Sequence, residues 1–161
     1  MKRLFLIRHG KSSWDHNLQD QDRPLKKRGY KDAALVLDAF PKAMGEPEKI
    51  WSSFATRALE TAKLFKEKFK VAEDDFQIRR DLYTFNSKEL LQIIKSCDNS
   101  INRLMIFGHN PAITEVVNFL GSEFFENIPT TGLCIIDFET EDWKVLEEGK
   151  TVLHLFPKHL K

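Results

Sequence analysis

Four side chains that can handle a phosphoryl group follow apolar runs in this sequence. They are Arg8 and His9 after LFLI, Arg57 after KIWSS, and His109 after RLMIF. In an open α/β sheet, ligands bind where strands end and loops lead into helices. Two histidines and two arginines delivered to such an edge are typical of a site that transfers a phosphoryl group.

Each of these side chains has a role that its chemistry suits. A neutral imidazole is a capable nucleophile near neutral pH, because its pKa lies near about 6.5. Guanidinium groups match phosphoryl oxygens with two parallel hydrogen bonds. A second imidazole can donate a hydrogen bond to the same oxygens as charge redistributes. The set predicts covalent catalysis at a histidine, without a metal or another cofactor.

Arg57 and His109 also have purely structural interpretations. Arg57 falls in the first turn of a predicted helix, where the helix dipole disfavours a cation and an anionic ligand would remove that penalty. Taken alone, Arg57 is better explained as a solvated arginine or as the ion-pair partner of Glu60 or Glu67. The alternative for His109 is a histidine hydrogen-bonded into the core.

An alternation of strands and helices positions these residues. Short apolar runs predict strands, and apolar residues at helical spacing predict helices. The predicted strands cover residues 4–7, 49–53, 76–78 and 103–107, and the predicted helices cover residues 25–40, 55–69, 87–97 and 112–120. This order predicts the α/β class: a three-layer α/β/α sandwich around a mainly parallel central sheet.

The C-terminal part of the chain has a different pattern. Residues 132–139, 143–148 and 151–156 predict antiparallel strands at one edge of the sheet.

Two of the predicted helices begin with capping signals. Asn86 and Glu89 have the offset of a capping box. Asn110 and Pro111 predict an N-cap and a first helical residue, which places His109 beside free N–H groups that attract anions.

Length and charge limit the classes of function. The 161 residues, with 42% hydrophobic and 30% charged residues, predict one globular domain. A net charge of +1 argues against nucleic acid or an acidic membrane as a general partner. Cys97 and Cys134 lack CxxC spacing and predict buried free thiols in a reducing compartment. No run approaches the roughly 18 apolar residues of a membrane span. A cytoplasmic protein is expected.

Three segments together resemble the signatures of the histidine phosphatase superfamily, also called phosphoglycerate mutase-like. They are LFLIRHG, SSFATRALETA and GHNPAI. The segments RHGKSSWD and DRPLKKRGYKDA are most similar to the small SixA-type phosphohistidine phosphatases. The resemblance covers nearly the whole chain and implies a single histidine phosphatase domain over residues 1–161.

The resemblance implies roles for five residues. His9 would be the nucleophile that becomes phosphorylated, and Arg8, Arg57 and His109 would form the rest of the phosphate pocket. Arg23 would lie at the mouth of the pocket. Its alternative is a salt bridge with Asp20 or Asp22, and the two interpretations are about equal.

Two residues depart from the mutase branch. That branch has the signature ESxWN, in which Ser12 and Trp14 match, but Lys11 and Asp15 replace the glutamate and the asparagine. The departure weakens a mutase assignment. His16, in the same stretch, is predicted to be a solvated loop histidine.

The resemblance also implies a carboxylic acid after the third strand that protonates an oxygen leaving group. Asp81 is the nearest match, and a small shift of alignment would place Leu82, Tyr83 or Thr84 there instead. Glu89 is explained by the capping box. A phosphohistidine needs less help from an acid, because imidazole is a better leaving group than an alkoxide.

The spacing of the candidate residues predicts a shallow pocket without a long lid. Such a pocket suits a phosphohistidine on another protein. The alternatives are a small phosphorylated metabolite, a mutase reaction, or a non-catalytic phosphate-binding module.

Overall fold

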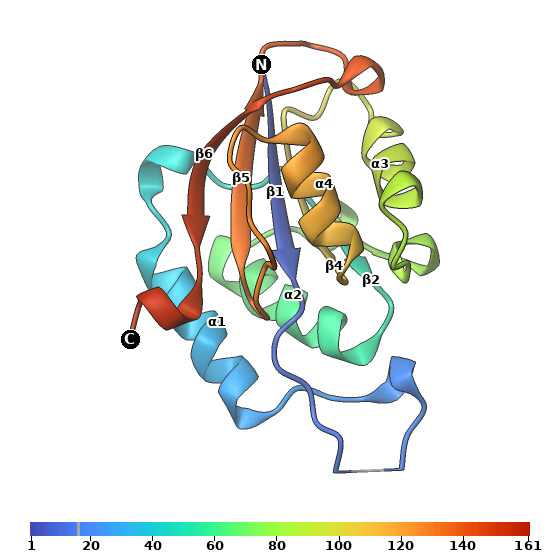
Figure 1. The fold of residues 1–161 in the computed structure, drawn as a ribbon, viewed down its shortest axis with the longest axis vertical. Helices are drawn as coiled ribbons and strands as arrows, with labels where there is room; N and C mark the ends of the chain where they lie inside the picture. The colour runs from blue at the N-terminus through green and yellow to red at the C-terminus, as the bar shows by residue number, and fades with distance from the viewer. Residues whose placement is uncertain (16) are drawn as a thin grey trace.

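The computed structural model describes residues 1–15 and 17–161, and His16 lies outside the described residues. Within them, six strands form one sheet in the order β3-β2-β4-β1-β5-β6 (Figure 1). The strands β1 to β4 pair in parallel, whereas β5 is antiparallel to both β1 and β6. The predicted α/β class, with a mainly parallel sheet and an antiparallel edge, is confirmed.

The elements alternate along the chain as their patterns predict. The strands are β1 (Lys2–Arg8), β2 (Lys49–Ser53), β3 (Phe76–Arg79), β4 (Arg103–Gly108), β5 (Leu133–Phe138) and β6 (Lys150–Leu155). The helices are α1 (Lys27–Ala39), α2 (Thr56–Phe69), α3 (Ser87–Lys95) and α4 (Ala112–Leu120). Short 3-10 turns include η1 (Asp20–Asp22), η4 (Arg80–Leu82) and η5 (Trp143–Val145).

Two hydrophobic clusters, one on each face of the sheet, form the core. Alternate side chains of β1 point to opposite faces: Leu4 and Leu6 belong to one cluster, and Phe5 and Ile7 to the other. The first cluster includes side chains of α3 and α4, and the second includes side chains of α1 and α2. The sheet therefore lies between two helical layers, as Figure 1 shows.

The strand predicted over residues 143–148 is wrong. Trp143–Val145 form η5 instead, because the Asp142 side chain accepts a hydrogen bond from the Lys144 backbone at 2.9 Å and starts a turn. The indole of Trp143 is fully buried, and its Nε1 donates to the Ile101 carbonyl at 2.7 Å. A buried anchor in a turn produced the apolar pattern that resembled a strand.

The predicted capping box of α3 is confirmed at Asn86 and wrong at Glu89. The Asn86 side chain accepts from the backbone N–H groups of Lys88 and Glu89, as predicted. The Glu89 carboxylate accepts from the Thr84 hydroxyl at 2.7 Å rather than from the Asn86 backbone.

The N-cap of α4 lies one residue later than the predicted Asn110. Pro111 occupies the N-cap position of α4, and the Asn110 side chain accepts from the backbone N–H of Thr114 at 3.0 Å.

The strand order brings the candidate side chains together. β4 lies between β2 and β1, so the carboxyl ends of these three parallel strands are neighbours. They end at Ser53, Gly108 and Arg8, and the chain leads from β2 and β4 into α2 and α4.

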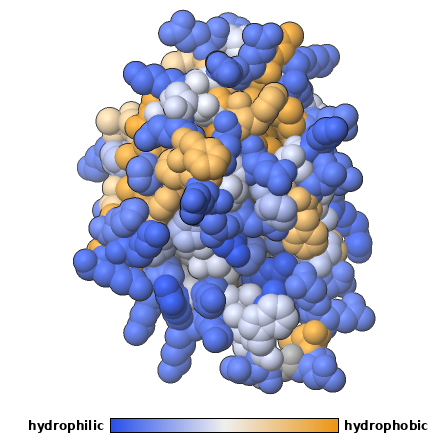
Figure 2. All heavy atoms as spheres, in the orientation of Figure 1, coloured by the Kyte–Doolittle hydropathy of each residue, from blue (hydrophilic) through white to orange (hydrophobic). Residues whose placement is uncertain are grey.

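The surface carries no single dominant apolar area on the face that Figure 2 shows: hydrophobic residues lie in separate patches among hydrophilic ones. The exposed large hydrophobic side chains include Phe85, Phe119 and Phe124. Among residues 1–15 and 17–161, no helix is both long enough and apolar enough to cross a lipid bilayer.

Candidate active site

A cavity of about 530 Å³ opens at the carboxyl ends of β1, β2 and β4. Its described lining residues are Arg8, His9, Lys11, Ser12, Trp14, Asp20, Arg23, Arg57, Tyr83, Phe85, His109, Asn110 and Thr130. Four of these side chains, three arginines and a lysine, carry a positive charge and one is a carboxylate, so the cavity favours an anionic ligand. The structure thus brings Arg8, His9, Arg23, Arg57 and His109 to one place.

His9 is held directly after the end of β1. Its Nδ1 lies 2.7 Å from the Gly10 carbonyl, which can only accept, so Nδ1 carries the proton and Nε2 keeps a lone pair. Gly10 is closely packed: an added Cβ would lie 2.9 Å from Leu25 Cδ2 and 3.2 Å from Thr131 Oγ1, so these side chains would have to shift. The Gly10 backbone donates to Thr61 Oγ1 at 2.9 Å, and that hydroxyl donates to the Arg57 carbonyl at 2.7 Å. These bonds couple the nucleophile candidate to the first turn of α2.

Arg57 is the second residue of α2 and is buried. Its Nε donates to His9 Nε2 at 3.3 Å, and its Nη2 lies 3.4 Å from His109 Nδ1. Nη1 donates to the Asp20 carbonyl at 2.6 Å, and Nη2 donates to Asp20 Oδ2 at 2.9 Å. Asp20 therefore supplies the negative charge that offsets a cation at a helix N-terminus. The interpretations of Arg57 as a solvated side chain or a partner of Glu60 or Glu67 are wrong.

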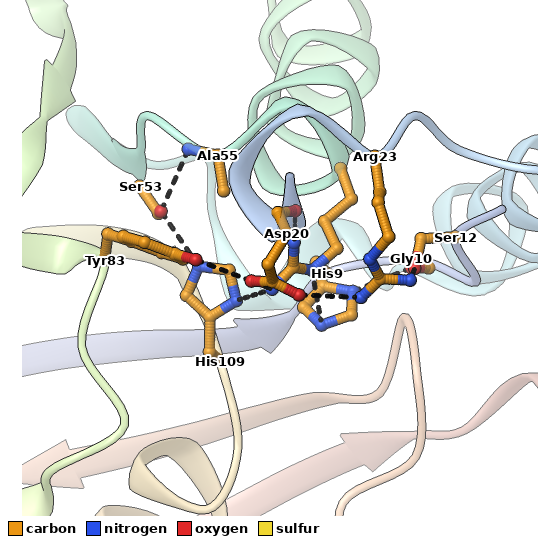
Figure 3. A network of polar contacts seen from close by, with 10 residues as sticks. His9, Gly10, Ser12, Asp20, Arg23, Ser53, Ala55, Tyr83 and His109 are labelled. Carbon is orange, nitrogen blue, oxygen red and sulfur yellow. Dashed lines mark hydrogen bonds and ion pairs between the residues drawn. The ribbon is translucent and has the colours of Figure 1, made fainter. Parts of the chain in front are cut away.

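His109 follows β4 and lies opposite His9, with the two ring centroids 5.2 Å apart (Figure 3). Its Nε2 lies 2.9 Å from Ser53 Oγ at the end of β2. The edges of Tyr83 and Phe85 pack around the ring, at centroid distances of 5.3 and 5.4 Å. His109 is buried, as its structural interpretation requires, and it also lines the cavity.

The two remaining arginines have backbone or side-chain anchors. Arg8 Nη1 donates to the Ile128 carbonyl at 3.0 Å. Arg23 Nη1 donates to Ser12 Oγ at 2.8 Å, and its guanidinium lies 3.5 Å from the ring centre of Trp14. Within the described residues, Nε of both arginines is buried and has no hydrogen-bond partner.

Both interpretations of Arg23 hold at once. Its Nη2 pairs with Asp20 Oδ1 at 3.1 Å, and the same side chain lines the cavity.

Burial keeps both imidazoles neutral. Desolvation lowers the pKa of His9 to about 3, against the hydrogen bond to Gly10, and the nearby charges of Arg57, Arg8 and Arg23 lower it further. Desolvation also lowers the pKa of His109 to about 3, with added contributions from His9 and Arg57. Near neutral pH, both rings are therefore uncharged, and His9 has the lone pair that a nucleophile needs.

Asp81 is not brought to the cavity. It lies in η4, its carboxylate pairs with Arg79 at 2.8 Å, and it is exposed. The hydrogen bond from Arg79 lowers the pKa of Asp81 against the effect of burial. An ionised carboxylate outside the cavity cannot protonate a leaving group there, so the geometry does not support Asp81 as the acid.

Three residues of the site have contacts that sequence reasoning missed. The sequence indicates Asp20 only as a possible ion-pair partner of Arg23, and Tyr83 only as an alternative to Asp81. Tyr83 Oη donates to Asp20 Oδ2 at 2.6 Å, so the two form one wall of the cavity. Ser53 received no role, although its hydroxyl contacts His109 and accepts from the Ala55 backbone at 3.2 Å.

Lys11 and Asp15, which depart from the mutase signature, differ in their position relative to the cavity. Lys11 lines the cavity and adds a positive charge there. The Asp15 backbone N–H donates to Ser13 Oγ at 3.0 Å, and Asp15 is not among the lining residues.

Known structures share this fold. The chain assigned as phosphohistidine phosphatase SixA of Agrobacterium tumefaciens is 24% identical, with a TM-score of 0.80 over 96% of this chain and 97% of that one. The protein histidine phosphatase SixA in complex with tungstate is 18% identical, with a TM-score of 0.82 over 99% of both chains.

Similar sequences occur in plants and bacteria. An uncharacterised chloroplast protein of Arabidopsis thaliana is 35% identical over 128 residues, which are 74% of this chain and 59% of that protein. This chain thus spans less than two thirds of that relative. An uncharacterised protein of Mycobacterium tuberculosis is 23% identical over 157 residues, 91% of this chain and 96% of its own.

The family model described as histidine phosphatase superfamily (branch 1) matches residues 4–86, which include the end of β1, Arg23 and Arg57. The fold, with His109 facing His9 across the cavity, agrees with that match. The chain belongs to the histidine phosphatase superfamily.

Proposed function

We propose that this chain is a phosphatase that takes the phosphoryl group of a protein phosphohistidine onto His9 and then releases it to water. The observation that carries the proposal is the protonation and orientation of the His9 ring. Its ring is neutral and its Nδ1–H is fixed on Gly10, so the Nε2 lone pair faces Arg57 in a cavity lined by basic side chains.

The cavity has hydrogen-bond donors for phosphoryl oxygens. The Nη1 and Nη2 atoms of Arg57 donate to two oxygens of Asp20 here, and the same planar fork would match phosphoryl oxygens that replace them. Arg8 and Arg23 each have a buried Nε without a partner among the described residues. A group that offers several anionic oxygens would satisfy these donors, and a phosphoryl group is such a group.

His109 would bind the phosphoryl group from the other side. Its Nδ1 is next to Arg57 Nη2, and its Nε2 is next to the Ser53 hydroxyl. A hydroxyl can donate or accept. When a phosphoryl oxygen replaces His109 as the partner of Arg57 Nη2, Nδ1 of His109 can donate to that group. Ser53 can still hydrogen-bond to Nε2 of the ring.

Two features favour a phosphohistidine as the donor. The single carboxylate among the described lining residues, Asp20, is ionised near neutral pH, since its pKa is lowered to about 2. The described lining residues thus include no ready acid to protonate an alkoxide leaving group. An imidazole leaving group needs less help from such an acid. The exposed aromatic side chains of Trp14 and Phe85 line the cavity and give a partner protein an apolar surface near its entrance.

The reaction then has two steps. The His9 Nε2 lone pair attacks phosphorus in a donor whose other ring nitrogen is protonated. The electron pair of the broken P–N bond returns to the donor ring, which leaves as a neutral imidazole. Water next attacks the same phosphorus, and the electron pair of the second P–N bond returns to His9 Nε2. Arg57 would stabilise the charge that develops on the phosphoryl oxygens in both steps.

Turnover of matched substrates tests the proposal. A histidine-containing carrier domain, phosphorylated on its histidine, should be dephosphorylated with a kcat/KM at least about 100-fold above that of a panel of small phosphomonoesters. A His9→Asn variant should lose activity on both. Faster turnover of a small phosphomonoester would make that compound class the substrate, and no turnover of any donor would leave a phosphate-binding module.

A further inference from the structure

Asp20 is the carboxylate that faces the candidate phosphate pocket, and it is held there by three side chains. Its Oδ2 accepts from Arg57 Nη2 at 2.9 Å and from Tyr83 Oη at 2.6 Å. Its Oδ1 accepts from Arg23 Nη2 at 3.1 Å (Figure 3). All three donors belong to residues that line the cavity.

Asp20 occupies the fork of Arg57 that a phosphoryl group would need. Both Nη atoms of Arg57 donate to Asp20, one to its carbonyl and one to its carboxylate. Two anions cannot share this fork without strong repulsion. A phosphoryl group that binds Arg57 must therefore displace the carboxylate, while Tyr83 and Arg23 can keep it beside that group.

The displaced carboxylate would lie on the solvent side of phosphorus. The Asp20 side chain is 43% exposed, whereas His9 is 8% exposed. In an in-line displacement, water enters opposite the leaving Nε2 atom, and hence from the open side of the pocket. Asp20 is on that side, and the other nearby carboxylates are engaged elsewhere: Asp81 with Arg79, and Glu89 with Thr84.

We infer that Asp20 is the general base that activates the water in the second step, an inference that rests on the proposed function. Water oxygen forms a bond to phosphorus, and the P–Nε2 bond breaks with its electron pair returning to His9. The water proton moves to Asp20 Oδ2, and Asp20 later gives that proton to the solvent. Phosphate leaves, and Asp20 returns to Arg57.

The ionisation of Asp20 agrees with a base rather than an acid. Burial raises the pKa of Asp20, but the hydrogen bonds from Tyr83, Arg57 and Arg23 and the charge of Arg57 outweigh it and lower the pKa to about 2. The carboxylate is therefore ionised near neutral pH, the form that a general base needs. Loss of the Arg57 contact when a phosphoryl group binds removes one of the causes that lower its pKa. It would serve donors whose leaving group needs no proton from the enzyme.

The time course of protein-bound label tests the inference with an Asp20→Asn variant, which keeps the shape of the side chain. Protein and a phosphohistidine donor carrying labelled phosphoryl groups are mixed, quenched at intervals, and assayed for acid-labile label on the chain and for free phosphate. We expect transfer to His9 within tenfold of the wild-type rate and release slowed at least about 100-fold, so that label accumulates. Asp22→Asn, in the same turn η1, is the matched control and should behave as wild type.

Three other outcomes would overturn the inference. Unchanged release in Asp20→Asn shows that another group activates the water. Equal slowing of transfer and release shows that Asp20 only positions Arg57. If the wild-type chain takes up no label at all, the proposed function fails, and this inference fails with it. Circular dichroism and the melting temperature of the variant separate these outcomes from a folding defect.

Discussion

The Nε hydrogen of Arg57 points at Nε2 of His9 across 3.3 Å, from the first turn of α2 to the residue that follows β1. Since Nε2 accepts this hydrogen bond and Nδ1 donates to Gly10, the ring of His9 has one tautomer, with the proton on Nδ1. The atom that faces the cavity is the unprotonated nitrogen.

This relationship predicts the ¹⁵N chemical shifts of His9. In the free protein, Nδ1 should have the shift of a protonated ring nitrogen and Nε2 that of an unprotonated one. Because burial lowers the pKa of His9 to about 3, this pattern should persist from pH 7 to pH 5. A His9→Asn spectrum assigns the signals. A ring that titrates near pH 6.5, or a proton on Nε2, would contradict the geometry.

Arg57 should not be replaceable by lysine. An Arg57→Lys variant keeps the charge but loses the Nε contact to His9 and the planar pair of Nη1 and Nη2 that can bind two oxygens. We expect kcat/KM on a phosphohistidine donor to fall by about 10²- to 10³-fold. Arg28→Lys, on the exposed face of α1, is the control and should keep wild-type activity. A loss of kcat/KM below fivefold for Arg57→Lys would contradict a catalytic role for the planar guanidinium group.

Oxyanion affinity should rise when the competing carboxylate is removed. Asp20 occupies the fork of Arg57, so an Asp20→Asn variant should bind tungstate about tenfold more tightly, a gain of about 1.4 kcal/mol. Isothermal titration calorimetry at fixed ionic strength measures the change. Asp22→Asn should bind as wild type does. Weaker binding by Asp20→Asn would mean that the carboxylate orients Arg57 rather than competing for it.

Acid should destabilise the fold through the two buried histidines. An unfolded histidine binds its proton near pH 6.5, whereas the pKa of His9 and of His109 in the fold is about 3. Between these values the unfolded chain binds more protons, so the free energy of unfolding falls as pH drops from about 6.5 toward 3. Each histidine contributes a slope of at most about 1.4 kcal/mol per pH unit.

Urea denaturation at several pH values checks this slope. A His109→Gln variant removes one of the two buried rings, so its stability should depend less steeply on pH between 6.5 and 4.5. His159→Gln, in the exposed C-terminal turn, is the control. Equal slopes for wild type and His109→Gln would contradict the neutral, buried state of His109.

The buried strands and the four main helices were predictable because each has a clear periodic pattern. The pattern of β1, for example, ends at Arg8, and this also fixes where His9 must lie. The edge position follows from the parallel order of β1, β4 and β2, which brings distant residues together. The cluster of His9, Arg57 and His109 was therefore within reach of sequence reasoning.

The carboxylate of the site, Asp20, could not be predicted from the sequence. Asp20 lies in η1, a short turn in a loop without periodicity, and its contacts to Arg57 and Tyr83 join segments far apart in the chain. The place of Asp81 after β3 made it the predicted acid, but Asp81 lies in η4 and its carboxylate pairs with Arg79. The positions of Asp20 and Asp81 both depend on the conformation of a loop, which the local sequence pattern does not determine.

The central claim is that His9 becomes phosphorylated during turnover. The most direct measurement mixes the wild-type chain with a labelled phosphohistidine donor, quenches at millisecond times, and locates the acid-labile label by peptide mapping. The account predicts label on His9, formed no more slowly than turnover, and none in His9→Asn. Label on another residue, or steady release of phosphate by His9→Asn, would contradict it.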